Sequence, residues 1–343
     1  MNQAKSNPGE GVSMRVAVEQ VTGQRERGPV RAMVMSQPFW VTIALLIMCA
    51  IMGKISDVFF TDDNFFNVTR NFSFIGILAL GMTAVIITRG IDLSVGSIVG
   101  VSGMVSAMVL NAGHSWWTGI GAGLLTALAC GFVNGVLVAY LNLSSFIVTL
   151  GMFAVARSLA QVLSQNRMIY QFGPDERVFE QVGGGSILGI ANTFIVLLAL
   201  TIIFMIAFRY TTWGRWVYAI GGNEQAARLT GVPVNRIKLS VYMLSGLMAG
   251  ICAVLLVGWQ GAAINAMGTG YELRAIASSV IGGTDLMGGA GGAYGAFIGA
   301  ALIEVIRNSL LLAGVDANWE GTFVGLFIVF AVMLSKFRGM RSG

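Results

Sequence analysis

Apolar residues in this chain form long runs that are separated by short polar or glycine-rich breaks. A helix needs about 20 apolar residues to cross a hydrocarbon core about 30 Å thick, and runs of this kind recur from Phe39 to Leu334. They predict ten transmembrane helices, at residues 39–56, 71–88, 92–111, 116–140, 145–163, 187–208, 239–258, 271–283, 292–313 and 319–335. The expected fold class is therefore an all-α polytopic membrane protein.

The eighth predicted span, at residues 271–283, differs from the others. It is short, begins with Glu272 and Arg274, and runs into a glycine-rich segment. Non-helical backbone at membrane depth is tolerated where it is buried in protein or lines a water-filled cavity. We therefore expect a broken or re-entrant element here instead of a complete helix.

The composition supports a membrane location and excludes several function classes. Of the 343 residues, 55% are hydrophobic and 11% are charged, whereas soluble domains have about 25% charged residues. The three cysteines, Cys49, Cys130 and Cys252, lie far apart in apolar runs, and His114 is the only histidine. A disulfide framework, a metal site and a catalytic Ser-His-Asp triad are therefore not expected, and nothing in the chain predicts an enzyme.

Lysine and arginine are unevenly distributed over the two sides that ten spans create. If the amino terminus is cytoplasmic, the inside segments hold 14 of these residues and the outside segments hold five. Cytoplasmic loops carry such an excess, so both termini are expected in the cytoplasm, and the net charge of +5 requires no nucleic-acid partner. The predicted organisation is a polar cytoplasmic tail at 1–38, one transmembrane domain at 39–336 with a cytoplasmic loop at 209–238, and a basic cytoplasmic tail at 337–343.

The cytoplasmic loop at 209–238 contains a short predicted helix. Asn223 suits its N-cap, Glu224 suits its positive first turn, and Gly231 followed by Pro233 ends it. Two interpretations stay open: the helix is a connecting turn, or it is a docking element whose small alanine-rich surface fits a groove on a cytoplasmic protein. The residues that would carry the docking are Asn223, Glu224, Ala226, Ala227, Arg228 and Gly231.

The same stretch resembles the cytoplasmic coupling segment of sugar permeases from ABC importers of the ribose, xylose and arabinose type. The resemblance is carried by Asn223, Ala226, Ala227, Arg228 and Gly231. Three further stretches resemble this family in the expected order: GIDLSVGSIVG at 90–100, SFIVTLGMFAVARSLA at 145–160 and GYELRAIASSVIGGTDLMGGAGGAYGAFIGA at 270–300. The chain departs from the family at Ser144 and Ser145, where prolines often stand.

The resemblance implies a permease subunit in the bacterial inner (cytoplasmic) membrane, with about ten spans, through which a monosaccharide passes. It also implies three protein partners: a second permease subunit, identical or different, a cytoplasmic ATP-binding subunit and a periplasmic sugar-binding protein. The chain has no G-x-x-x-x-G-K-[ST] motif. ATP and Mg²⁺ are therefore expected on the partner ATPase, and no cofactor is expected in this chain.

Two segments resemble each other across 193 positions: Gly90-x-Asp92-Leu93-x-x-Gly96 and Gly283-x-Asp285-Leu286-x-x-Gly289. Each follows an apolar run and precedes another, so Asp92 and Asp285 are each expected to cap a helix. The alternative interpretation places these glycine-broken helices on the translocation pathway, where interrupted helices of transporters change conformation. The match is too short to distinguish a parallel from an inverted repeat.

A second group of polar residues lies inside the predicted spans. Glu304, Arg307 and Asn308 share one helix face, because they stand at positions i, i+3 and i+4. Charges within a membrane usually face protein or water and find a partner, so Glu304 and Arg307 either form an ion pair or, with Asn308, line the pathway. Arg157, four residues before Gln161, is interpreted in the same way. The uncharged candidates, which suit hydroxyl-rich solutes but also serve helix packing, are Ser94, Asn134, Thr149 and Gln260.

Other transport classes remain as alternatives. Related ABC permeases carry nucleosides, polyols or branched-chain amino acids. An ion-coupled secondary transporter usually has buried carboxylates at mid-membrane, whereas the acids here, apart from Glu304, are expected near span ends. A channel or a membrane enzyme is not supported, because the sequence shows neither a ring-forming charge motif nor a catalytic constellation.

Overall fold

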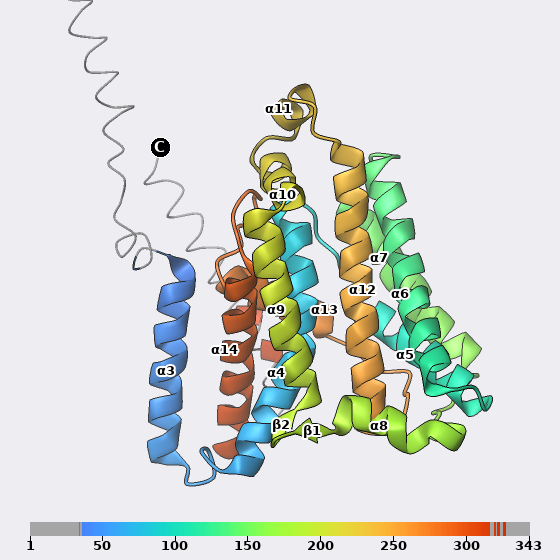
Figure 1. Ribbon diagram of the computed structural model, residues 1–343. Coiled ribbons are helices and arrows are strands. Elements are labelled where there is room, and N and C mark those ends of the chain that lie inside the picture. Colours follow the sequence, from blue (N-terminus) through green and yellow to red (C-terminus); the bar gives the residue numbers. More distant parts are fainter. Residues whose placement is uncertain (1–33, 35, 316–318, 320, 323–324, 327–343) are drawn as a thin grey trace, which may run out of the picture.

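The computed structural model describes residue 34, residues 36–315 and the positions 319, 321–322 and 325–326. Most of this part is helical, and the long helices lie side by side (Figure 1). The predicted tail at 337–343, most of the tail at 1–38 and most of the span at 319–335 lie outside the described residues.

Seven of the described helices are long and apolar enough to cross a membrane. They are α3 (Gln37–Ile55), α4 (Asp62–Ile87), α6 (Trp116–Ala139), α7 (Ser145–Leu163), α9 (Asn192–Tyr210), α12 (Val234–Gln260) and α14 (Ala293–Leu312). Each overlaps a predicted span, but α4 begins at Asp62 and not at residue 71. Thr61 caps it, and Asp62 and Asp63 lie in its positive first turn, so a polar helical segment precedes the apolar run.

Two further helices are shorter. α5 (Val95–Asn111) has 17 residues and α13 (Tyr271–Ile281) has 11. At 1.5 Å per residue, α13 is about 16 Å long, roughly half of a hydrocarbon core, which agrees with the broken element expected at 271–283. The described residues therefore hold seven helices long enough to cross a membrane and these two shorter ones, and the predicted count of ten spans is not reached within them.

Short elements mark the two ends of the helical bundle (Figure 1). One end, called here the α11 end, carries α10 (Thr212–Gly222) and α11 (Glu224–Leu229). The opposite end, the α8 end, carries the 3-10 turn η1 (Gly173–Asp175), α8 (Glu176–Gly184) and the antiparallel hairpin of β1 (Ser186–Ile187) and β2 (Ile190–Ala191). The predicted start of the span 187–208 was wrong, because this hairpin comes first and α9 begins only at Asn192.

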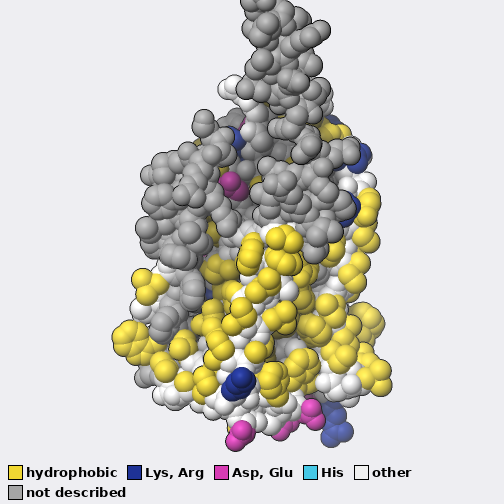
Figure 2. Space-filling model, turned by 90° about the vertical axis from the view of Figure 1, so that its left-hand side faces the viewer, with side chains coloured by type: hydrophobic (Ala, Val, Ile, Leu, Met, Phe, Trp, Pro, Cys, Tyr) yellow, Lys and Arg dark blue, Asp and Glu magenta, His cyan; other side chains and the backbone are white. Residues whose placement is uncertain are grey.

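Helices α4 and α12 form the centre of the bundle, and α3 lies at its edge. The apolar stretch of α4 is 89% buried and that of α12 is 78% buried, against 11% for α3. Small residues let α6 and α12 approach closely, since a Cβ on Gly131 would lie 3.2 Å from the Cα of Gly246. Apolar side chains remain exposed on α3, α7 and α9, for example Leu46, Ile147 and Ile202. Figure 2 shows hydrophobic side chains over much of the described part of one face, as a surface in contact with lipid requires.

Candidate functional site

Helix α11 has the local structure that its sequence predicts. Asn223 is its N-cap and accepts a hydrogen bond from Ala226 N at 3.0 Å, and Gly231, with φ of 84°, follows its end. Asn223 is also the C-cap residue of α10, so the two helices meet at a single residue. Helix α10 was not predicted, because its three glycines and its aromatic residues lower its intrinsic helix propensity.

Glu224 ties α11 to the beginning of α12. Its Oε2 accepts a hydrogen bond from Lys238 Nζ at 2.6 Å, and its Oε1 accepts one from Arg228 Nη2 at 3.3 Å. Partial burial by itself raises the pKa of Glu224, but the hydrogen bonds and positive charges of Lys238 and Arg228 outweigh this effect and hold the pKa below its ordinary value. The carboxylate is therefore ionised at neutral pH.

The side chains of α11 point to two different sides. Ala226 and Arg228 are exposed, and Leu229 is 89% exposed. Ala227 is only 4% exposed and belongs to the same core cluster as Val234. The expectation that Ala227 faces a partner is corrected by this burial, because a short helix that lies against the bundle needs a small side chain on its inner face. Leu229, which the sequence did not single out, is the large apolar side chain on the outer face.

Four of the predicted pathway residues come together in one buried polar cluster. Asp92 Oδ1 accepts hydrogen bonds from Ser94 N at 3.0 Å and Ser94 Oγ at 2.6 Å, and its Oδ2 accepts one from Ser245 Oγ at 2.8 Å. Asn134 Nδ2 donates to Ser94 Oγ at 2.9 Å, and Thr149 Oγ1 donates to the carbonyl of the residue before Asp92 at 3.3 Å. All four predicted residues are fully buried. The cluster joins α6, α7 and α12 to the irregular segment that precedes α5.

Asp92 and Asp285 make the same local contact, although neither caps a helix. The Oδ1 of each accepts a hydrogen bond from the backbone two residues later, at 3.0 Å from Ser94 N and at 2.9 Å from Met287 N. The N-cap residues of α5 and α14 are Ser94 and Gly292, so the capping interpretation was wrong. The Asp92 segment lies between α4 and α5, and the Asp285 segment lies between α13 and α14. In both cases the first helix runs toward the α11 end and the second runs away from it. The two segments therefore have the same orientation in the bundle, as in a parallel repeat.

Helices α5 and α13 meet at the places where their helical structure begins. A Cβ on Gly96, in the first turn of α5, would collide with Gly268 O and with Glu272 Oε2. Arg157 on α7 closes this junction, since its Nη1 donates to Asn265 O at 2.7 Å and to Met267 O at 2.8 Å. Its Nη2 also donates to Gly96 O at 3.4 Å, so the hydrogen-bond partners of Arg157 are backbone carbonyls of α5 and of the segment between α12 and α13.

Two carboxylates lie deeper in the bundle than the sequence indicated. Asp92 is fully buried and Glu272 is 9% exposed. Both acids stand near the beginning of a helix, Asp92 just before α5 and Glu272 in the first turn of α13, but these beginnings are buried in the bundle. Hydropathy treats each apolar run as one continuous helix, whereas helical structure begins only after Asp92, at Val95, and α13, which carries Glu272, has only 11 residues.

The polar face of α14 is occupied by one pair within the helix and one pair with α4. Arg307 Nε donates to Glu304 Oε2 at 3.0 Å and Arg307 Nη2 donates to Glu304 Oε1 at 3.0 Å, so the two residues form a bidentate ion pair within the helix. Asn308 Nδ2 donates to Asn64 Oδ1 at 2.8 Å, and Asn64 Nδ2 donates back to Asn308 Oδ1 at 3.2 Å. Glu304 and Arg307 were expected either to form an ion pair or to line the pathway, and their hydrogen bonds support the ion pair.

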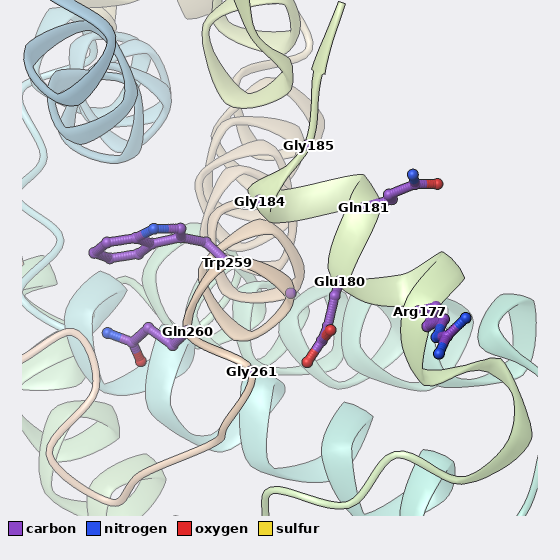
Figure 3. A pocket seen from close by; sticks show the side chains of 9 residues that line it. Arg177, Glu180, Gln181, Gly184, Gly185, Trp259, Gln260 and Gly261 are labelled. Atoms are coloured by element: carbon purple, nitrogen blue, oxygen red, sulfur yellow. The ribbon is translucent and has the colours of Figure 1, made fainter. Parts of the chain in front are cut away.

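Gln260 lies apart from these groups, at an open cavity of about 520 Å³ at the α8 end. The cavity is lined by Arg177, Glu180, Gln181, Gly184, Gly185, Gly258, Trp259, Gln260 and Gly261. Figure 3 shows Trp259 and Gln260 projecting to one side, whereas Arg177 and Gln181 project to the other. The polar groups do not converge on one point, so this cavity lacks the arrangement of a closed small-molecule site.

Several residues of these sites were not singled out from the sequence. Arg89, Ser245, Glu272 and Leu229 are the main ones. Arg89 stands directly before the GIDLSVGSIVG stretch, and this adjacency was the available signal. Within the described residues, no three His, Cys, Asp or Glu side chains gather in a way that could hold a metal ion.

Comparison with known proteins gives the family. Residues 64–332 match the family described as branched-chain amino acid transport system / permease component. The chain belongs to this permease family. Within it, the chain is 38% identical over 298 residues to the ribose import permease protein RbsC of Escherichia coli (strain K12), which covers 86% of this chain and 92% of that protein.

Two further relatives of this permease are named for other sugars. The L-arabinose ABC transporter permease protein AraH of Azospirillum brasilense is 33% identical over 298 residues, or 87% of each chain. The D-allose transport system permease protein AlsC of Escherichia coli (strain K12) is 35% identical over 296 residues, or 85% of this chain and 89% of that protein. No solved structure matches the chain. The resemblance to sugar ABC permeases that the four motifs indicated is confirmed.

Proposed function

We propose that this chain is the membrane permease subunit of an ATP-binding-cassette importer that carries a monosaccharide across the bacterial inner membrane. The observation that carries the proposal is the 38% identity to a ribose import permease over 92% of that protein. The relatives named for arabinose and allose extend the same solute class. In such an assembly the particular sugar is selected by the binding protein.

The orientation follows from the charge asymmetry, with 14 Lys and Arg residues inside and five outside. The α11 end then faces the cytoplasm, where a partner ATPase that holds ATP and Mg²⁺ docks on α11. The α8 end faces the periplasm, where a sugar-binding protein delivers the solute. A second permease subunit, identical or different, completes the pathway across the bilayer.

We place the gate of the pathway at the junction of α5 and α13. Interrupted helices with close glycine contacts suit a change of conformation, because a small displacement separates Gly96 from Gly268. Arg157 and the cluster around Asp92 position the two broken helices. Asp285 shapes the segment before α14, Gln260 lies at the periplasmic mouth, and Glu304, Arg307 and Asn308 secure α14.

The docking role of α11 is tested with Leu229→Asp, which replaces the apolar side chain on its outer face. Complete burial of a leucine contributes about 1.5–3 kcal/mol, so ATPase association is expected to weaken at least about tenfold. Leu188→Asp is the matched control for ATPase association, since Leu188 is a 97% exposed leucine in the hairpin at the end away from the ATPase. Co-purification with the ATPase and binding-protein-dependent uptake in vesicles are measured together. If Leu229→Asp binds the ATPase and transports like the wild type, α11 is not the docking element.

A second candidate function is import of a branched-chain amino acid, because the matching family is described by that solute. A nucleoside or a polyol belongs to the same class of alternatives. Vesicles that contain the complete complex should accumulate labelled ribose, arabinose or allose, and an excess of leucine should leave this uptake unchanged. Uptake of leucine alone would replace the sugar assignment and keep the ABC permease assignment.

A further inference from the structure

The last turn of α10 is held by a side chain from a distant part of the chain. Arg89 follows the end of α4 with a φ of 63°, and its Nε donates to Gly221 O at 2.7 Å while its Nη2 donates to Gly222 O at 2.7 Å. The last carbonyls of a helix have no partner within the helix, and a positive charge is favourable at that end. Arg89 therefore fixes the end of α10 at two points.

The same place is also a direct backbone contact between three segments. Gly289 N donates to Ile87 O at 2.9 Å, and a Cβ on Gly221 would collide with both of these atoms. Tyr218 on α10 adds a hydrogen bond from its hydroxyl to Gly291 O at 2.8 Å. The end of α4, the end of α10 and the glycine-rich segment between α13 and α14 are thus packed without intervening side chains. We call Arg89, Gly221 and Gly289 the α10 node.

The α10 node lies between the docking helix and both interrupted helices. On one side, Asn223 joins the end of α10 directly to α11. On the other side, the segment after Arg89 leads to Asp92 and α5, and the segment that contains Gly289 begins where α13 ends. A displacement of α11 is passed on by close packing, because packed interfaces shift between discrete arrangements and do not deform gradually.

We propose that the α10 node transmits the movement of α11 to α5 and α13 together, with Arg89 as the positioning residue. The proposal rests on the proposed function, in which a partner ATPase moves α11. Arg89 touches neither ATP nor solute in this account, and it acts through the carbonyls of Gly221 and Gly222. Loss of Arg89 should then separate ATP hydrolysis from uptake, whereas a merely structural contact would lower the amount of folded protein and leave the ratio of uptake to hydrolysis unchanged.

Arg89→Ala is compared with Arg215→Ala in the complete complex with its ATPase and binding protein. Arg215 is an exposed arginine on α10 whose hydrogen bonds stay local, to Tyr210 O and Thr212 Oγ1. Arg89→Ala should keep the ATPase bound and hydrolysis active, while uptake per ATP hydrolysed falls at least about tenfold, as expected for loss of hydrogen bonds to a charged group. Arg215→Ala should keep the wild-type ratio.

Two neighbouring glycines provide an independent test of the contact. Gly221→Ala places a Cβ against Ile87 O and Gly289 N, whereas a Cβ on Gly222 has no atom within 4 Å. Gly221→Ala should lower uptake per ATP hydrolysed as Arg89→Ala does, and Gly222→Ala should not. Tyr218→Phe removes the hydrogen bond to Gly291 O with little change of shape and should lower the ratio less, which keeps the test decisive if Gly221→Ala does not fold.

Each result has a defined meaning. If Arg89→Ala and the folded variants at Gly221 or Tyr218 keep the wild-type ratio, or if uptake and hydrolysis fall in proportion, the α10 node does not transmit movement and the proposal is wrong. If the wild-type chain itself binds no ATPase and transports no sugar, the proposed function is wrong instead. The wild-type measurement therefore separates the two failures.

Discussion

The carboxylate of Asp92 accepts a hydrogen bond from the hydroxyl of Ser245 at 2.8 Å, across 153 positions of sequence. Ser94 supplies two more donors to the same carboxylate. The bond joins the irregular segment before α5 to the central helix α12. The buried side chain of Asp92 thus has hydrogen-bond donors as its partners, and such donors stabilise a carboxylate.

Asp92→Ala is therefore expected to destabilise the fold strongly. It leaves buried donors of Ser94 and Ser245 without an acceptor, and each such group costs about 1–3 kcal/mol. Asp92→Asn keeps one acceptor oxygen and should cost less. Asp57 is exposed, and Asp57→Ala serves as the control with an expected change within about 0.5 kcal/mol. Thermal unfolding in detergent measures the difference, and an Asp92→Ala protein as stable as the control contradicts the role of the cluster.

The ion pair on α14 predicts a rescue by exchange. Neutralising Glu304 or Arg307 alone should cost about 3–5 kcal/mol, because it leaves the other charge within the membrane region without its bidentate partner. Combining Glu304→Arg with Arg307→Glu should restore much of the lost stability and uptake. The measurements are the level of folded protein and sugar uptake in vesicles. An exchange variant that is folded and abundant yet inactive would assign separate roles to the two residues.

The anchoring of α11 should depend on pH through Glu224. Its pKa is lower in the folded protein than the ordinary value of 4.5, so its contribution to stability is present above that value and is lost as the pH falls through the folded pKa. Between about pH 6 and about pH 3, the wild type should lose more thermal stability than Glu224→Gln, which has no charge to lose. Equal losses in both proteins would show that the contacts of Glu224 with Lys238 and Arg228 do not stabilise α11.

The orientation is tested by labelling single cysteines from outside, in a background without Cys49, Cys130 and Cys252. A cysteine at the exposed position Gln181 on α8 should react with a membrane-impermeant reagent, whereas one at the exposed position Gln225 on α11 should react only after the membrane is opened. The expectation rests on the excess of Lys and Arg at the α11 side. The opposite pattern would reverse the assignment of cytoplasmic and periplasmic ends.

Local patterns predicted the parts of this protein that depend on neighbouring residues in sequence. Runs of apolar residues located all seven long helices, because crossing a membrane is a requirement on length and composition. The cap at Asn223 and the turn at Gly231 could be predicted for α11, since capping involves residues only a few positions apart. The pair of Glu304 and Arg307 could be anticipated for the same reason, because residues three apart share a helix face.

Only the tertiary structure decided where the helices are interrupted and what the interruptions contact. Hydropathy predicts one span at 92–111, whereas the first residues of this range form an irregular segment before α5. Hydrogen-bond donors from α6 and α12, which are far away in sequence, hold this segment in place. Ala227 and Leu229 have similar surroundings in sequence, but packing against the bundle buries the first and leaves the second exposed. Arg89 is an ordinary basic residue in its own segment, and its role arises from the carbonyls of Gly221 and Gly222 that the fold brings to it. Such contacts depend on long-range packing, which the local spacing of residues does not encode.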